Sequence, residues 1–225
     1  MSDQVTTYYD ASATRYRMSS TRRRHVITLL DRWLAAHPTQ QCRILDIGFC
    51  AGEIGAYVRS KKDSRIHIDG IDISPDQVAA HAHEYDTARV VNIEAEDWAL
   101  SLGRTYDLII ASELVEHLFR PDLFLGRLKK LLAPGGTVIL TTPNLLLWSK
   151  RIKFLFGYHA YSATGLFEWG HIHLFSWRFL KHLLAENGYR IVDSYHILHP
   201  NALTPFQKML PTGLFAYQFV LALQI

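Results

Sequence analysis

Two glutamates and a histidine follow an apolar segment closely and could carry out proton transfer. Glu113, Glu116 and His117 come after Tyr106–Ala111, which reads as a buried strand. If the turn is helical, positions i, i+3 and i+4 share one face and the three side chains could converge. Histidine changes charge nearest neutral pH, so we expect His117, with Glu116, to be catalytic. The alternatives are that the three residues hold a divalent ion such as Mg²⁺, or that His117 only lines a pocket.

A second group of residues, in a glycine-containing turn, is suited to hold a nucleoside. Gly48 and Gly52 in the stretch Asp46–Gly52 admit positive φ and let a ligand approach the backbone. Asp72 stands twenty residues beyond Gly52, at the end of the next apolar strand. In doubly wound sheets an acid at this place accepts hydrogen bonds from ribose hydroxyls. The first two turns therefore predict a nucleoside site.

The glycine spacing of dinucleotide-binding proteins is not present in this turn. Counted from Gly48, the third and sixth positions hold Cys50 and Glu53, where that motif has glycines. Asp46 and Glu53 would repel a diphosphate, but they suit a ligand with an amino group and a sulfonium. Electrostatics therefore favours S-adenosylmethionine, and a nicotinamide-dependent oxidoreductase is the weaker alternative.

Five motifs in order, within about Tyr8 to Tyr195, resemble those of the class I S-adenosylmethionine-dependent methyltransferases. The motifs are Asp46–Gly52, Gly70–Ser74, Tyr106–Ile110, Leu132–Gly136 and Thr142–Asn144. Cys50 replaces the family's usual second glycine, and its thiol is small enough for cofactor binding to survive. The segment Glu113–His117 is similar to the Glu-x-x-Glu-His of ubiquinone-biosynthesis O-methyltransferases, in which it is associated with a metal.

The resemblance implies how the cofactor is held. Its carboxylate and amino end would lie over Gly48 to Gly52, and Asp72 would hold the ribose. An acid after the third strand, Glu96 or Asp97, would meet the adenine amino group, although both could be solvated acids at a helix start. The expected cofactor contacts are Asp46, Gly48, Phe49, Cys50, Gly52, Asp72, Ile73, Glu96, Asp97, Trp98 and Ser112.

An aromatic and basic stretch, residues 145–175, is expected to form a lid insert over the methyl acceptor. Such a roof would exclude water from the sulfonium. Its lysines and arginine beside aromatic residues also allow peripheral contact with a membrane, and the alternative is an ordinary lid over a soluble small molecule. The expected acceptor contacts are Tyr9, Tyr16, Asn144, Trp169, His171 and His173.

The elements that must position these residues alternate between strands and helices, which predicts a parallel sheet with helical crossovers. A first helix over Thr21–His37 precedes the sheet, and Tyr189–Leu198 with Tyr217–Gln224 could form an antiparallel hairpin. We expect an α/β fold with a doubly wound, Rossmann-like sheet of seven strands, mostly parallel, and helices on both faces. Further strands are expected at Arg43–Ile47, Ile66–Ile71, Arg89–Ile93, Tyr106–Ala111 and Thr137–Thr142, and helices at Gly52–Ser60, Pro75–Tyr85, Asp122–Leu132 and Ser176–Asn187.

Composition limits the class of protein further. The 225 residues have a net charge of +3 and are 48% hydrophobic, which excludes disorder and suits a single domain over 1–225, with 1–40 as a helical cover. Two cysteines and no secretory signal favour a cytoplasmic location. The small charge excess argues against nucleic acid, and the oligomeric state stays open.

We expect an enzyme that transfers a methyl group from S-adenosylmethionine to a small-molecule acceptor. A phenolic or other hydroxyl oxygen is the favoured acceptor atom, because a histidine base is useful when a proton must leave. The alternatives are N- or C-methylation of a small molecule, and a non-catalytic module that keeps the nucleoside site.

Overall fold

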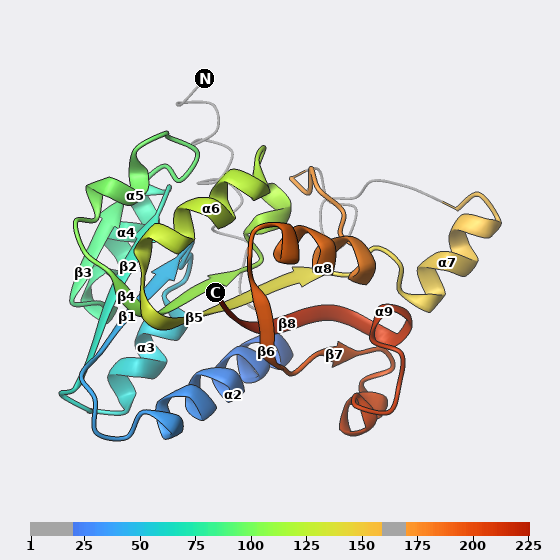
Figure 1. Cartoon of the computed structure of the whole chain (residues 1–225), viewed down its shortest axis with the longest axis horizontal. Coiled ribbons are helices and arrows are strands. Elements are labelled where there is room, and N and C mark those ends of the chain that lie inside the picture. The colour runs from blue at the N-terminus through green and yellow to red at the C-terminus, as the bar shows by residue number, and fades with distance from the viewer. Residues whose placement is uncertain (1–19, 159–169) are drawn as a thin grey trace.

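A mixed sheet forms the centre of the computed structural model, which describes residues 20–158 and 170–225. The strands are β1 (Cys42–Ile47), β2 (Ile66–Asp72), β3 (Thr87–Val90), β4 (Tyr106–Ser112), β5 (Leu132–Pro143), β6 (Arg190–Ser194), β7 (Ile197–Leu198) and β8 (Ala216–Gln224). Their order is β3-β2-β1-β4-β5-β8-β6, with the two-residue β7 pairing to β8 (Figure 1). The first five strands pair in parallel, and β8 is antiparallel to β5, β6 and β7. This confirms the predicted Rossmann-like sheet with antiparallel C-terminal strands.

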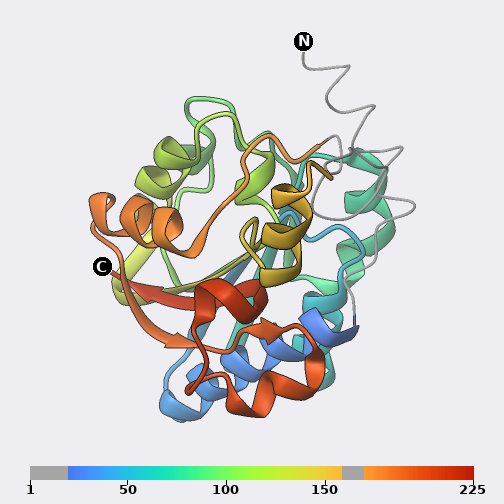
Figure 2. The same cartoon turned by 90° about the vertical axis from the view of Figure 1, so that its right-hand side faces the viewer.

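Helices cover both faces of the sheet (Figures 1 and 2). One core cluster joins the sheet to α2 (Ser20–Ala36) and α3 (Glu53–Ser60). Another joins it to α5 (Trp98–Ser101), α6 (Pro121–Leu131) and α8 (Trp177–Glu186). Successive residues of β4 point to opposite faces, so Leu108 and Ile110 belong to the first cluster and Ile109 and Ala111 to the second. The other α-helices of the described residues are α4 (Pro75–His81), α7 (Trp148–Leu155) and α9 (Thr212–Phe215). The 3₁₀ turns are η1 (Ala82–Glu84), η2 (Val115–His117) and η3 (Asn201–Phe206).

Three observed ends differ from the predicted ones by more than two residues, and the predicted strand Tyr189–Leu198 is divided into β6 and β7. β3 ends at Val90, because its pairing with β2 stops there, and does not reach Ile93. The helix predicted to reach Tyr85 ends at His81 and continues as the tighter turn η1, after which the Tyr85 hydroxyl donates to Asp46 of β1. β5 begins at Leu132, before the predicted start at Thr137, and its pairing with β4 shifts register between Leu132 and Thr137.

The carboxyl ends of β1, β2 and β4 meet at one edge of the sheet, where a doubly wound fold binds its ligand. The strands end at Ile47, Asp72 and Ser112, so the predicted glycine turn, ribose acid and glutamate–histidine segment all follow at this edge. None of the helices in the described part of the chain has the length and apolar character needed to cross a membrane.

Candidate active site

The turn after β1 offers its backbone to a ligand. Gly48, Cys50 and Gly52 have φ of 69°, 47° and 63°, in the left-handed region that glycine adopts most easily. Cys50 does so with a side chain, at a cost of order 1 kcal/mol, and its amide donates to Asp72 at 2.8 Å. A Cβ on Gly48 would lie 3.2 Å from Leu114 Cδ1, so this turn approaches the segment after β4 closely.

Asp72 connects the first turn to the second. Its side chain is buried, Oδ2 accepts from Cys50 N at 2.8 Å, and Oδ1 accepts from Ser74 N at 2.9 Å. Because each carboxylate oxygen has two acceptor positions, the group can shape both turns and still meet ribose hydroxyls. Ile73, also predicted to contact the cofactor, follows it and is half-buried.

A buried acid and a tyrosine lie beneath the glycine turn. Asp46 accepts a hydrogen bond from Tyr85 Oη at 2.9 Å, and burial raises the pKa of its carboxyl to about 7, with the charge of Asp72 acting in the same direction. The Tyr85 ring lies 4.6 Å from that of Phe49. Sequence reasoning missed Tyr85. A possible signal was Gly70, where an added Cβ would come within 2.8 Å of the Tyr85 ring.

The residues predicted to lie near the adenine differ in their exposure to solvent. Glu96 and Asp97 are exposed just before α5. This exposure agrees both with contact to the adenine amino group and with solvated acids at a helix start. Trp98 is 2% exposed and packs in the core against Phe124, with ring centroids 6.0 Å apart. The indole of Trp98 is therefore part of the hydrophobic core, and only its buried edge could contact the cofactor.

The residues after β4 form a polar network with β5 and α2. Ser112 Oγ and Thr141 Oγ1 are hydrogen-bonded at 3.0 Å, and Thr141 Oγ1 donates to Glu113 Oε1 at 2.9 Å. Glu113 Oε2 forms an ion pair with Arg22 at 3.2 Å, and Arg22 Nε also donates to Gln218 Oε1. Sequence reasoning missed Arg22 and Thr141, whose roles depend on tertiary contacts that leave no local pattern.

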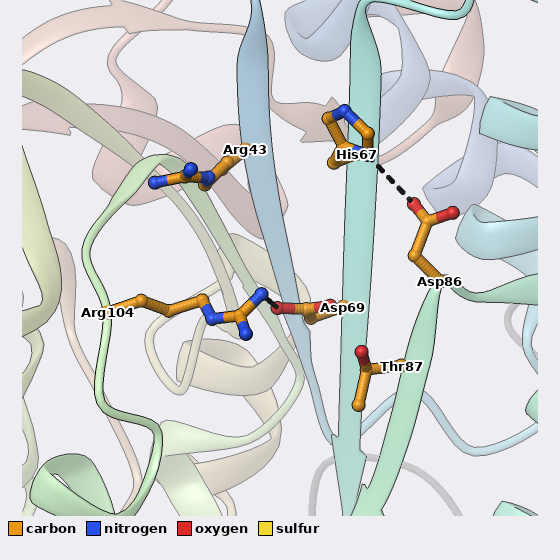
Figure 3. A pocket seen from close by; sticks show the side chains of 6 residues that line it. All are labelled: Arg43, His67, Asp69, Asp86, Thr87 and Arg104. Carbon is orange, nitrogen blue, oxygen red and sulfur yellow. Dashed lines mark hydrogen bonds and ion pairs between the residues drawn. The ribbon is translucent and has the colours of Figure 1, made fainter.

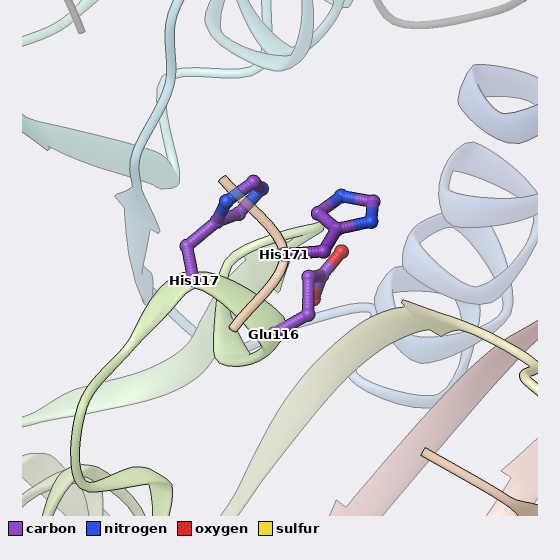
Figure 4. Close-up of side chains that lie close together, drawn as sticks. All are labelled: Glu116, His117 and His171. Carbon is purple, nitrogen blue, oxygen red and sulfur yellow. The ribbon is translucent and has the colours of Figure 1, made fainter. Parts of the chain in front are cut away.

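Three side chains meet above η2 (Figure 4). Glu116, His117 and His171 each place one potential ligand atom within 4.8 Å of the others. Glu116 is fully buried, and neither of its carboxylate oxygens forms a hydrogen bond of ordinary length with the described residues, although the Thr142 side chain acts to lower its pKa. The His117 and His171 ring centroids are 4.7 Å apart. The structure thus adds His171 to the predicted pair of Glu116 and His117.

The protonation of this cluster follows from its burial. Burial, together with the charge of Glu113, raises the pKa of Glu116 well above its ordinary value. Burial lowers the pKa of His117 to about 4, and His171 acts in the same direction. His117 Nδ1 lies 2.8 Å from the carbonyl oxygen of Gly170. A neutral imidazole donates from one nitrogen only, so we assign the proton to Nδ1, which leaves Nε2 as the basic atom.

The predicted Mg²⁺ ligands do not form the cluster that the structure shows. Glu113 is engaged by Arg22 and Thr141, and His171 takes its place beside Glu116 and His117. Mg²⁺ prefers oxygen ligands and keeps several waters, whereas this set offers two imidazoles and one fully buried carboxylate. Glu113 is not part of the observed cluster. The three residues that form the cluster do not fit Mg²⁺.

The residues predicted to contact the acceptor have different surroundings. His171 lies against His117, and the backbone N–H of His173 donates to the Glu116 carbonyl at 2.9 Å, which places this segment across η2. Asn144 is buried, and its amide donates to the carbonyls of Ala216 and Gly213. Asn144 therefore supports the backbone of the C-terminal segment. Tyr9, Tyr16 and Trp169 lie outside the described residues.

A separate hollow of about 240 Å³ lies at the opposite, amino-terminal edge of the sheet (Figure 3). Its lining residues are Arg43, His67, Asp69, Asp86, Thr87 and Arg104. Arg104 pairs with Asp69 at 3.5 Å, and His67 lies 3.9 Å from Asp86. The charged side chains of this hollow are largely paired with one another. Ligands of doubly wound sheets bind at the carboxyl edge, so we do not place the active site in this hollow.

Comparison with known proteins agrees with this geometry. A family model described as "Methyltransferase domain" matches residues 18–194, so the chain belongs to this family and is a class I S-adenosylmethionine-dependent methyltransferase. The predicted transferase class and cofactor are thus confirmed, and the oxidoreductase alternative falls.

One curated relative is the ubiquinone biosynthesis O-methyltransferase of Hydrogenovibrio crunogenus, which is 34% identical over 105 residues, 45% of this chain and 42% of the relative. The chain spans about half the length of the curated relatives it matches.

Solved structures show the same fold at low sequence identity. Magnesium protoporphyrin IX methyltransferase from Synechocystis, solved with bound S-adenosylhomocysteine, matches with a TM-score of 0.65 at 14% identity, over 99% of both chains. A 1,6-didemethyltoxoflavin N1-methyltransferase from Burkholderia thailandensis matches with a TM-score of 0.60 at 17% identity, over 99% of this chain and 85% of that one. Both neighbours are methyltransferases named for small-molecule acceptors.

Proposed function

We propose that this chain methylates a hydroxyl oxygen, phenolic or otherwise, on a small-molecule acceptor. The observation that carries the proposal is His117, a neutral imidazole at the carboxyl edge of the sheet with its Nδ1 held by the Gly170 carbonyl. A base is needed for a hydroxyl acceptor, whose proton must leave. O-methylation is also the activity in the names of the curated relatives.

The proposed step is a direct displacement at the methyl carbon. A lone pair of the acceptor oxygen forms the new C–O bond as the C–S bond breaks, and the sulfonium becomes a neutral thioether. The hydroxyl proton passes to His117 Nε2. Much of the rate comes from holding the acceptor in line with the sulfonium. Glu116 supports acceptor binding, because its buried carboxyl forms no hydrogen bond of ordinary length with the described residues and a polar acceptor atom would provide one.

Replacement of His117 by Gln tests this assignment. We expect kcat to fall about 10²- to 10⁴-fold, the usual contribution of a general base, while affinity for S-adenosylhomocysteine stays the same. Transfer from labelled S-adenosylmethionine into a cell extract, with mass spectrometry of the product, identifies the acceptor and the methylated atom.

The matched control is His182→Gln, which changes an exposed histidine on α8. It should leave both rate and affinity unchanged. A product methylated on nitrogen or carbon, or an H117Q enzyme as fast as the native one, would contradict the proposal for oxygen.

A further inference from the structure

One end of the molecule exposes large apolar side chains together with cations. It is formed by α7 with the residues up to Tyr158 and by the segment 199–215, which contains η3 and α9, and we call it the α7–η3 end (Figures 1 and 2). Leu155 is 81% exposed and Met209 is 82% exposed. The exposed large apolar residues of this end are Ile152, Leu155, Phe156, Tyr158, Phe206 and Met209.

The two segments of this end are joined by specific contacts. Trp148 Nε1 donates to the carbonyl of His199 at 3.1 Å, and the Arg151 guanidinium donates to the carbonyls of Leu146 and Gly213 at 2.7 and 3.4 Å. No residue of α7 is fully buried. The helix is thus fixed at its start while its later turn projects outward.

The charge of the α7–η3 end has one sign. Residues 145–158 and 199–215 contain four cationic side chains and no aspartate or glutamate, although the whole chain has 24 cations against 21 acids. The cations are Lys150, Arg151, Lys153 and Lys208. A short helix with cations beside exposed aliphatic and aromatic side chains suits the boundary between anionic head groups and acyl chains.

We propose that the α7–η3 end docks on the surface of an anionic lipid bilayer. Leu155 and Phe156 enter the interface, and Lys153 and Lys208 meet the lipid phosphates. A second copy of this chain is a poorer occupant, because it would bring like charges together. A nucleic acid would use the cations and leave the aliphatic side chains in water.

Docking by this end would turn a defined side of the enzyme toward the membrane. Residues 144–147 connect β5 to α7 at the carboxyl edge of the sheet, where the candidate active site lies. The acceptor side would therefore face the bilayer. The proposal does not depend on which acceptor is methylated, since binding to lipid is measured without any substrate.

Vesicle co-sedimentation with the full chain tests the proposal. We expect binding to vesicles of phosphatidylcholine with phosphatidylglycerol, little binding to phosphatidylcholine alone, and loss of binding at high salt. Leu155→Glu should weaken binding about tenfold or more, because it replaces an inserted apolar side chain by an acid. Lys153→Glu should weaken it in the same direction.

The matched control is Leu100→Glu on α5, since Leu100 is 69% exposed and α5 lies at the far side of the molecule from α7 (Figure 1). It should bind vesicles as the native chain does, and affinity for S-adenosylhomocysteine should be equal in all variants. Absence of vesicle binding, equal loss in L155E and L100E, or a native dimer that L155E converts to monomers would overturn the proposal.

Discussion

At the scale of single residues, Asp72 has the clearest part in the candidate site. Its two oxygens accept from the amides of Cys50 and Ser74, and these bonds hold the turns that follow β1 and β2. Hydrogen bonds to a charged group contribute about 1.5–3 kcal/mol each. The same side chain therefore shapes the site and, by our expectation, binds the ribose within it.

Asp72→Ala should reduce affinity for S-adenosylmethionine and S-adenosylhomocysteine by about 10- to 100-fold, which corresponds to the loss of about one such hydrogen bond. Isothermal titration calorimetry measures both ligands. Asp76→Ala, at an exposed acid on the first turn of α4, is the control and should bind as the native chain does. Unchanged affinity in D72A would remove the ribose assignment.

At the scale of elements, α2 does more than cover the sheet. Arg22, in its first turns, pairs with Glu113 after β4 and donates to Gln218 of β8. Glu113 has a φ of 52°, a conformation that costs a non-glycine residue energy and is maintained by its surroundings. The helix thus stabilises the segment that carries Glu116 and His117.

Arg22→Gln should move the acid limb of the pH–rate profile to higher pH. The positive charge of Arg22 lowers the pKa of His117, and the negative charge of Glu113 raises it, so without Arg22 the base is protonated at a higher pH. The measurement is kcat/KM against pH, with kcat and KM separated.

The control for this experiment is Arg23→Gln, since Arg23 is more exposed and pairs with Glu53 instead. R23Q should keep the native profile, and the double variant R22Q/E113Q should move the profile back toward it. A profile that does not change in R22Q would show that Arg22 supports only the fold.

At the scale of the whole molecule, buried histidines make stability depend on pH. His196 is 4% exposed between α8 and the C-terminal strands, near His25 of α2. Burial lowers the pKa of His196 to about 4, and His25 adds to this effect. The unfolded chain then binds more protons than the folded one between pH 6.5 and about 4.

The contribution of His196 to stability is therefore complete above about pH 6.5 and is lost as the pH falls toward 4, by about 3 kcal/mol in all. Urea unfolding at neutral and acidic pH measures the loss. His196→Gln should make stability less dependent on pH in this range, whereas the exposed His67→Gln should not. An equal acid loss in H196Q would assign the effect to other groups.

Much of the fold and part of the site could be predicted because their signals are local. The glycine turn, Asp72 and the apolar strands lie within short stretches, so their periodicity and spacing are visible in the sequence. The partnership of His171 with His117 and that of Arg22 with Gln218 could not be predicted in this way. His117 bonds to a carbonyl 53 residues away, and Arg22 and Gln218 are 196 residues apart. Only the packed sheet brings such residues together.

The place of β8 in the sheet has a consequence for the order of assembly. β6 precedes β8 in the chain, yet in the described structure it is held to the rest of the sheet through β8. During synthesis, β6 therefore emerges before the strand it needs, while β1 to β5 can already pair. The earlier half can reach its native pairing on the ribosome, and the later half must wait for residues 216–224.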